Sequence, residues 1–168
     1  MKIILIYLFL ISLNLFGQDY NHFTIDTVKN KKMLIGYCTK EAFQDTAFSN
    51  WFNENYSNYQ PDNQILDELQ NFLNNLKIKI VLGTWCSDSR EFVPAFLKIL
   101  DSIKFPEENL EMICVDRNKK GYQNEVDNLD INFVPTFIFY KNDKEIGRII
   151  EIPNTTLEND FLEIVKNN

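Results

Sequence analysis

The sequence predicts an α/β protein whose central mixed sheet is flanked by helices. From residue 78 onward, short apolar runs alternate with segments of helical periodicity, in the order β-α-β-α-β-β-α. That order combines a parallel strand pair with an antiparallel hairpin. The chain has 168 residues with 45% hydrophobic content, which is enough for one globular domain with its own core.

The first residues have the character of a secretory signal peptide, which we place at 1–17. Lys2 precedes a short apolar run that ends near Gly17, a succession typical of such peptides. The run is too short to span a bilayer comfortably. We therefore expect cleavage near Gln18, export to the periplasm or the extracellular space, and no stable membrane insertion. An uncleaved membrane anchor is the alternative, because Leu15 fits the small-residue rule of cleavage sites poorly.

Residues 18–77 are predicted to be a largely helical N-terminal extension. A short strand is expected at 32–37, where apolar residues precede a glycine. Aromatic residues then recur at roughly helical spacing over 48–59, which is more typical of a core-facing helix than of a binding face. An amphipathic helix is predicted over 62–76, with Asp62 as its cap.

Residues 78–168 are predicted to form the main domain. Strands are expected at 78–82, 110–115, 136–140 and 146–152, and helices at 86–103, 122–129 and 156–166. The last two strands are joined by the turn-rich residues 141–144. This link predicts a β-hairpin.

Composition argues against several classes of function. The net charge is −7 and no basic block occurs, so nucleic acid and anionic lipid surfaces are poor candidate partners. His22 is the single histidine, which cannot form a metal site with a second one. Only five glycines occur and none forms a phosphate-binding loop. We expect no cofactor and no bound metal.

The chain contains three cysteines, Cys38, Cys86 and Cys114. An odd number leaves at least one thiol without a partner in the same chain. Cys114 lies in the middle of a predicted strand, where a free cysteine packs as a small hydrophobe, so we expect an inert core thiol. The sequence cannot place Cys38 close to Cys86, and a resolving role for Cys38 is not expected. Cys86 is the candidate reactive thiol.

Three features surround Cys86 in a specific pattern. Trp85 and Cys86 come shortly after the strand at 78–82 and open the helix that follows. Pro94 lies inside that helix. The sequence Val-Pro-Thr at 134–136 immediately precedes the hairpin. A thiolate at a helix N-terminus is stabilised by the helix dipole and by free backbone N–H groups.

With these features, residues 78–168 resemble the thioredoxin-like fold family. The resemblance implies that Pro94 kinks the helix and that Pro135 follows a cis peptide bond in a loop against Cys86. It also implies that Trp85, Val134 and Pro135 bind substrate, because an extended chain can pair with the backbone beside such a proline. The implied partners are proteins with thiols or disulfides.

Two positions depart from the family pattern. Ser89 occupies the place of the family's second, resolving cysteine, and Ile80 occupies the place of its buried acid. Dithiol exchange within this C-x-x-S motif is therefore excluded. One-thiol chemistry remains: Cys86 forms a mixed disulfide, the Ser89 hydroxyl hydrogen-bonds the sulfur, and an external thiol reductant releases the product. Isomerisation and deglutathionylation are reactions of this kind.

Charges in the first turn of the helix do not decide whether Cys86 is reactive. Arg90 favours a thiolate there, whereas Asp88 and Glu91 oppose it. The alternative function is a redox-silent, thioredoxin-like module that binds proteins through the Pro135 loop and the N-terminal extension. Whether the protein is an enzyme is left open by the sequence.

Overall fold

The computed structural model describes residues 19–168. The predicted signal peptide therefore lies outside the described residues. The strands are β1 (His22–Asp26), β2 (Lys31–Cys38), β3 (Leu76–Leu82), β4 (Leu110–Cys114), β5 (Thr136–Lys141) and β6 (Lys144–Ile150). The helices are α1 (Ser49–Asn58), α2 (Asn63–Leu69), α3 (Ser87–Ser102) and α4 (Leu157–Lys166). Short 3-10 helices occupy Lys40–Gln44, Gln70–Phe72 and Glu107–Asn109.

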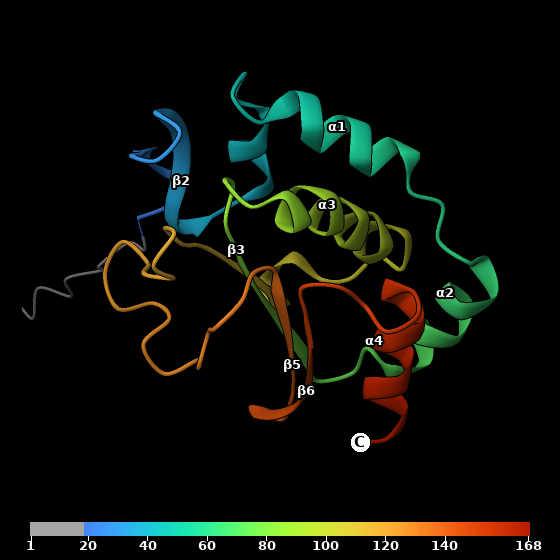
Figure 1. Ribbon diagram of the computed structural model, residues 1–168. Helices are drawn as coiled ribbons and strands as arrows, with labels where there is room; N and C mark the ends of the chain where they lie inside the picture. The colour runs from blue at the N-terminus through green and yellow to red at the C-terminus, as the bar shows by residue number, and fades with distance from the viewer. Residues whose placement is uncertain (1–18) are drawn as a thin grey trace, which may run out of the picture.

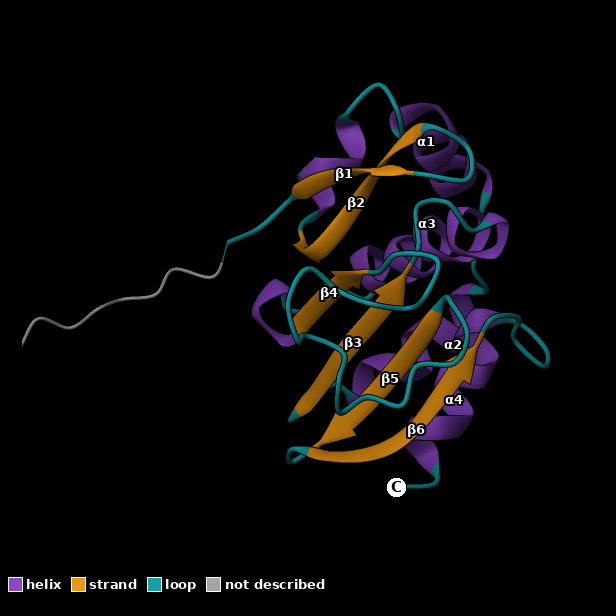
Figure 2. Ribbon diagram, turned by 60° about the vertical axis from the view of Figure 1, so that its left-hand side comes forward, coloured by secondary structure: helices purple, strands orange, loops and turns teal. Residues whose placement is uncertain are grey.

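The strands form one mixed sheet in the order β1-β2-β4-β3-β5-β6. Strands β3 and β4 are parallel, and the other neighbouring strands are antiparallel. All four helices pack on one face of this sheet (Figures 1 and 2). Side chains alternate along β3, so Ile80 and Leu82 join the helix-side core while Val81 faces the opposite way. The predicted α/β architecture is confirmed.

The second face of the sheet is covered by the long connection between β4 and β5 (Figure 2). Val126 and Val134 of this connection pack with Val81, Ile113 and Val115 in a small buried cluster. The connection is irregular, with no α-helix in it. It nevertheless buries this face of the sheet as a helix would.

The prediction of a helix at 122–129 is therefore wrong. Its apolar residues recur at helical spacing, but the segment forms separate turns, in which Asp127 N donates to Asn124 O and Leu129 N donates to Val126 O. In each of these bonds the donor lies three residues after the acceptor, as in an isolated turn. The two turns bring Val126 and Leu129 onto the sheet without a continuous helix. Spacing alone does not distinguish such turns from a short helix.

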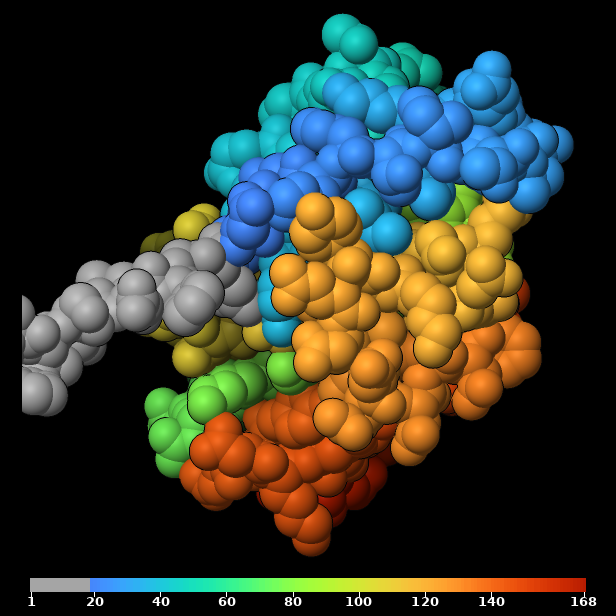
Figure 3. All heavy atoms as spheres, turned by 90° about the vertical axis from the view of Figure 1, so that its left-hand side faces the viewer, coloured from blue at the N-terminus to red at the C-terminus, as the bar shows by residue number. Residues whose placement is uncertain are grey.

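The extension contributes strands as well as helices. The strand predicted at 32–37 is observed as β2, which pairs antiparallel with β4. β1 was not predicted, because its apolar residues Phe23 and Ile25 alternate with polar ones over only five residues. Figure 3 shows the β1–β2 hairpin next to the connection between β4 and β5, and the rings of His22 and Tyr122 stack there with centroids 4.1 Å apart. The division at residue 78 stays a prediction, although both of its parts supply strands to the sheet.

Helices α1 and α2 lie close to their predicted positions. The aromatic segment forms α1, whose Phe52 is buried and stacks on Phe43. Asp62 caps α2 by accepting a hydrogen bond of 2.8 Å from Gln64 N. α2 ends at Leu69 rather than near residue 76, because the chain passes through a 3-10 turn and a left-handed Asn75 (φ 57°) into β3.

Candidate functional site

The end of β3 and the start of α3 place Cys86 at a helix N-terminus. Cys86 is the N-cap residue of the 16-residue helix α3 and has extended backbone angles. Its amide donates to Gly83 O at 2.9 Å, and its carbonyl accepts from Arg90 N at 3.2 Å. The tight turn from Gly83 to Cys86 therefore sets where the half-buried sulfur lies. Pro94 lies inside α3, as expected.

The loop that precedes β5 lies against Cys86. The Val134–Pro135 peptide bond is cis, and the Cys86 thiol donates to Val134 O at 3.2 Å. Pro135 O accepts a bond of 2.7 Å from Glu151 N, which fixes this loop to the end of β6. The structure thus brings together Cys86, Val134 and Pro135, which the sequence predicted as site residues.

Ser89 has a different partner from the expected one. Its side chain is fully buried, and its Oγ accepts a hydrogen bond of 3.1 Å from Gly83 N. The prediction paired this hydroxyl with the Cys86 sulfur, but that sulfur is bonded to Val134 O. A buried N–H is costly to leave without a partner, so Ser89 holds the turn that carries Cys86.

Trp85 is fixed between the turn and the second face of the sheet. Its indole Nε1 donates to Val115 O at 2.8 Å. Trp85 and Cys86 both pack against the buried cluster on that face. A Cβ at Gly83 would lie 2.6 Å from the Trp85 ring, so only glycine allows the indole to fold back over this turn.

Arg117 is a site residue that the sequence analysis missed. Its guanidinium carbon lies 4.9 Å from the centre of the Trp85 ring. Two hydrogen bonds of 2.8 Å hold the guanidinium on Asp26, from Nε to Oδ1 and from Nη2 to Oδ2. Asp26 is only 3% exposed. These bonds are the main reason that the pKa of Asp26 falls to about 2.

The same contacts keep a positive charge beside the cysteine. The pKa of Arg117 is raised, first by the hydrogen bonds to Asp26 and to a smaller degree by a charge interaction with Cys86. Strand polarity gives the signal that was overlooked. β3 and β4 are parallel neighbours, so residues that follow them, such as Cys86 and Arg117, meet at one edge of the sheet.

Arg90, the cation expected to act on Cys86, is directed elsewhere. Its Nε donates to Thr84 O at 2.7 Å, and its guanidinium carbon lies 5.9 Å from the centre of the Trp51 ring on α1. The contacts of Arg90 therefore connect the turn to α1. Arg117 lies near enough to Cys86 for the two groups to interact electrostatically.

The two other cysteines lie together in the core. The sulfurs of Cys38 and Cys114 are 3.2 Å apart, and both residues are buried. Burial raises the pKa of the Cys114 thiol well above its usual value, and the neighbouring Cys38 adds to this. Cys114 is a core residue, as predicted, and the partner of Cys38 is Cys114 rather than Cys86.

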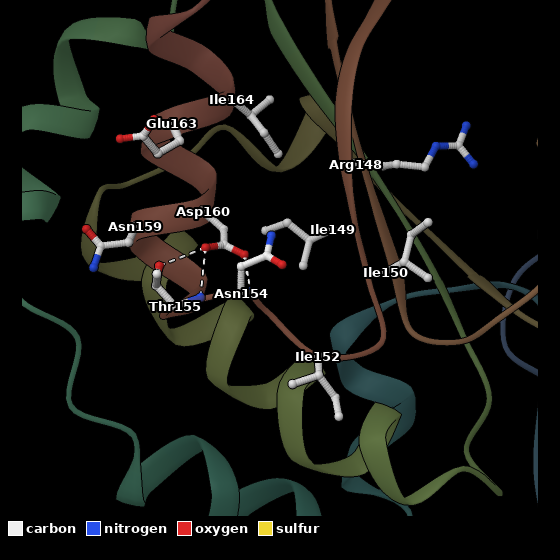
Figure 4. A pocket seen from close by; sticks show the side chains of 10 residues that line it. All are labelled: Arg148, Ile149, Ile150, Ile152, Asn154, Thr155, Asn159, Asp160, Glu163 and Ile164. Carbon is white, nitrogen blue, oxygen red and sulfur yellow. Dashed lines mark hydrogen bonds between the residues drawn. The ribbon is translucent and has the colours of Figure 1, made fainter.

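A hollow of about 690 Å³ lies between β6 and the start of α4 (Figure 4), and none of the predicted site residues lines it. At its edge, Asp160 accepts hydrogen bonds from Asn154 N at 2.6 Å, Thr155 N at 3.1 Å and Thr155 Oγ1 at 2.8 Å. These bonds hold the connection between β6 and α4.

Within residues 19–168, no helix has the length and apolar character that a membrane crossing requires.

Several solved structures are similar to this chain, and two of those named below are thioredoxins. A protein of unknown function from Pseudomonas aeruginosa superposes with a TM-score of 0.50 at 15% identity, covering 71% of this chain and 81% of that one. Thioredoxin from Fasciola hepatica has a TM-score of 0.40 at 21% identity, covering 61% and 89%. Mitochondrial thioredoxin 3 from Saccharomyces cerevisiae has a TM-score of 0.40 at 17% identity, covering 68% and 99%.

No curated protein matches the chain. The family model described as thioredoxin matches residues 40–161. The match begins after the β1–β2 hairpin and includes α1, α2 and the Cys86 turn. Because it spans more than half of the sequence, this chain belongs to the thioredoxin family.

Proposed function

We propose that this protein is exported and performs monothiol thiol–disulfide chemistry on other proteins through Cys86. The observation that carries the proposal is the sulfur of Cys86 at the N-terminus of α3, 3.2 Å from the carbonyl that precedes Pro135. Helix N–H groups and the helix dipole stabilise negative charge at that position. Arg117 adds a fixed positive charge nearby.

The reaction needs one protein thiol and one external thiol. The Cys86 thiolate attacks a sulfur of the substrate disulfide, forms the mixed disulfide, and releases the other substrate sulfur as a thiolate. That thiolate can attack a different disulfide of the same substrate. The substrate thiolate released there then attacks the mixed disulfide and frees Cys86, which gives isomerisation. Otherwise an external thiol reductant attacks the mixed disulfide and releases Cys86. With glutathione as the attached group, the same exchange is deglutathionylation.

The contact with Val134 couples this chemistry to substrate binding. In the reduced protein, the Cys86 thiol donates to Val134 O. A thiolate or a mixed disulfide has no proton to donate, so formation of either leaves this carbonyl without that donor. Val134 O can then accept an N–H from an extended substrate, as in strand addition. Trp85, Val134 and Pro135 are the substrate-binding residues of this proposal.

Trapping of partners tests the reaction. Wild-type protein should accumulate mixed disulfides with client proteins, because Ser89 cannot resolve them. We expect adducts on non-reducing gels that disappear on reduction and are absent from Cys86→Ala. The double variant Cys38→Ala/Cys114→Ala is the matched control and should retain them. Adducts that persist in Cys86→Ala would contradict the proposed role of Cys86.

A second function, a redox-silent binding module, is favoured by the apolar surface around the Pro135 loop. Phe133, just before the loop, is 52% exposed, and Ile152, next to the residue bonded to Pro135 O, is 65% exposed. Exposed apolar residues on both sides of a loop suit a peptide partner. The rate of Cys86 alkylation at neutral pH separates the two functions. A rate equal to that of an unstructured cysteine peptide, with no adducts, would favour the binding module.

Export is tested independently of the thiol chemistry. The support is the charged, apolar and small-residue succession in residues 1–17. N-terminal sequencing of protein recovered from the periplasmic or extracellular fraction should give a chain that begins near Gln18. Full-length chain with Met1 in the soluble cytoplasmic fraction would contradict export and leave the role of Cys86 open to its own test.

A further inference from the structure

We propose that Cys38 and Cys114 form a second redox site, a disulfide that joins β2 to β4 and is separate from Cys86. The two sulfurs are 3.2 Å apart. A disulfide requires an S–S distance of about 2.05 Å, so a shift of roughly 1 Å between the sulfurs closes the bond. This proposal is independent of the function proposed for Cys86.

The sheet holds the two residues in reach of each other. Cys38 ends β2 opposite Met112, and Cys114 ends β4 opposite Gly36, so the cysteines are diagonal neighbours across an antiparallel pair. Both side chains belong to the helix-side core cluster. The sulfurs of these two diagonal residues are in contact, and Gly36 presents no side chain opposite Cys114.

A cavity gives small molecules a route to Cys38. It has a volume of about 230 Å³, and its lining includes Cys38 and Met112 from the sheet and Leu97 and Leu100 from α3. Cys114 is fully buried and is not part of this lining. Cys38 is therefore the thiol that meets a reagent first, and Cys114 is its internal partner.

The oxidation balances with a small-molecule disulfide as the oxidant. Cys38, as a thiolate, attacks one sulfur of that disulfide, forms a mixed disulfide and releases the first small thiol. Cys114 then loses its proton and attacks the Cys38 sulfur, which releases the second small thiol. Two protein thiols are oxidised and one small disulfide is reduced to two thiols. Deep burial makes this slow in the folded protein, because the reacting form is the thiolate.

The disulfide would link the N-terminal β1–β2 hairpin covalently to the part of the chain that the thioredoxin model matches. Strand β2 precedes the part of the chain that the thioredoxin model matches, whereas β4 lies inside it. A disulfide between them closes a long loop, which restricts the unfolded chain and stabilises the fold. The predicted export would place the pair in a compartment where disulfides persist.

Oxidative refolding of the Cys86→Ala variant tests the proposal, because that variant retains only Cys38 and Cys114. Reduced protein is unfolded in denaturant and refolded in a mixture of reduced and oxidised glutathione. We expect a folded monomer whose mass is lower by two hydrogen atoms, with a Cys38–Cys114 linked peptide after proteolysis. Reduction should lower its melting temperature by an amount on the order of 10 °C.

Two variants serve as controls. Cys38→Ala/Cys86→Ala and Cys86→Ala/Cys114→Ala should refold without the mass loss, and their melting temperatures should not change on reduction. A folded Cys86→Ala protein with two alkylatable thiols in the oxidising mixture would overturn the proposal. So would a population dominated by glutathione adducts or by dimers linked between chains. None of these outcomes would bear on the proposed role of Cys86, which the trapping experiment tests separately.

Discussion

The guanidinium of Arg117 lies over the indole of Trp85, with its central carbon 4.9 Å from the ring centre. Trp85 is the residue before Cys86, and Arg117 is held there by the buried carboxylate of Asp26. A residue of the N-terminal hairpin thus fixes a cation beside the candidate thiol. The hairpin is part of the site although the thioredoxin model match begins after it.

The first prediction concerns the charge of Arg117. Neutralising it in the double variant Asp26→Asn/Arg117→Gln, which avoids an unpaired buried carboxylate, should slow Cys86 alkylation at neutral pH. Because this variant also removes the opposing charge of Asp26, the rate should fall by less than the roughly threefold effect of a lone unit charge in a largely aqueous setting. The measurement is the pseudo-first-order rate of alkylation at low and high salt. The difference from wild type should shrink in high salt, since salt screens the interaction.

Arg117→Lys is the matched control, because it keeps the charge and loses the paired geometry. Its alkylation rate should stay closer to wild type than that of the neutral variant. Equal rates for wild type and the neutral variant at low salt would contradict an electrostatic role for Arg117.

The second prediction is a pH dependence of stability that comes from Asp26. Its pKa is 3.8 without partners and about 2 in the folded protein, chiefly because Arg117 donates hydrogen bonds to it. A lowered folded-state pKa contributes stability that is present above pH 3.8 and is lost as the pH falls toward 2. Urea unfolding of Asp26→Asn should therefore give lower stability than wild type at neutral pH.

The gap between Asp26→Asn and wild type should narrow between about pH 4 and pH 2, as the wild-type carboxylate takes up its proton. Asp143→Asn is the control, because its ion pair with Lys77 is solvent-exposed and exposed pairs contribute little. A gap that stays constant across this pH range would show that Asp26 does not act through its charge.

The sequence predicted those parts of the fold that depend on local patterns. The hairpin of β5 and β6 was predicted from the polar link at 141–144, and the structure has positive φ at both central residues, Asn142 and Asp143. The helix at 156–166 is observed as α4, with Thr156 as its N-cap. Turns and caps are set by a few neighbouring residues, so one sequence is enough to find them.

The parts of the site that the sequence missed depend on contacts between distant residues. Asp26 and Arg117 are 91 positions apart, and no local pattern links them. The sequence predicted a hydrogen bond between the Ser89 hydroxyl and the Cys86 sulfur, because both residues belong to one motif. Its actual partner, the amide of Gly83, depends on how the turn folds back over the start of α3. The same holds for Cys38 and Cys114, which the sheet register brings together.

The third prediction concerns Asp160, at the edge of the hollow in Figure 4. Asp160→Ala removes the acceptor for Asn154 N, Thr155 N and Thr155 Oγ1. Hydrogen bonds to a charged acceptor are among the stronger ones, so the loss should lower the free energy of unfolding by about 2–3 kcal/mol. The check is chemical denaturation.

Glu163→Ala is the control for Asp160, since Glu163 lines the same hollow but is exposed. Its effect on the free energy of unfolding should stay within about 0.5 kcal/mol. Equal effects of the two substitutions would mean that the Asp160 hydrogen bonds do not hold the connection between β6 and α4.

The last prediction separates the two roles of position 89. Ser89→Ala leaves the buried N–H of Gly83 without its acceptor. The loss should cost about 1–3 kcal/mol of stability and leave partner trapping by Cys86 intact.

Ser89→Cys should release trapped partners, because a thiol at this position can attack the mixed disulfide. The variant should also gain some activity in reducing a protein disulfide. That gain should be partial, because the fully buried Ile80 offers no carboxylate to take the proton of the new thiol. Trapping is read on non-reducing gels, and reduction is followed with a dithiol reductant and a disulfide-bonded protein substrate. If Ser89→Cys folds, keeps a reactive Cys86 and still accumulates adducts at the wild-type level, the missing second thiol is not what stalls the reaction.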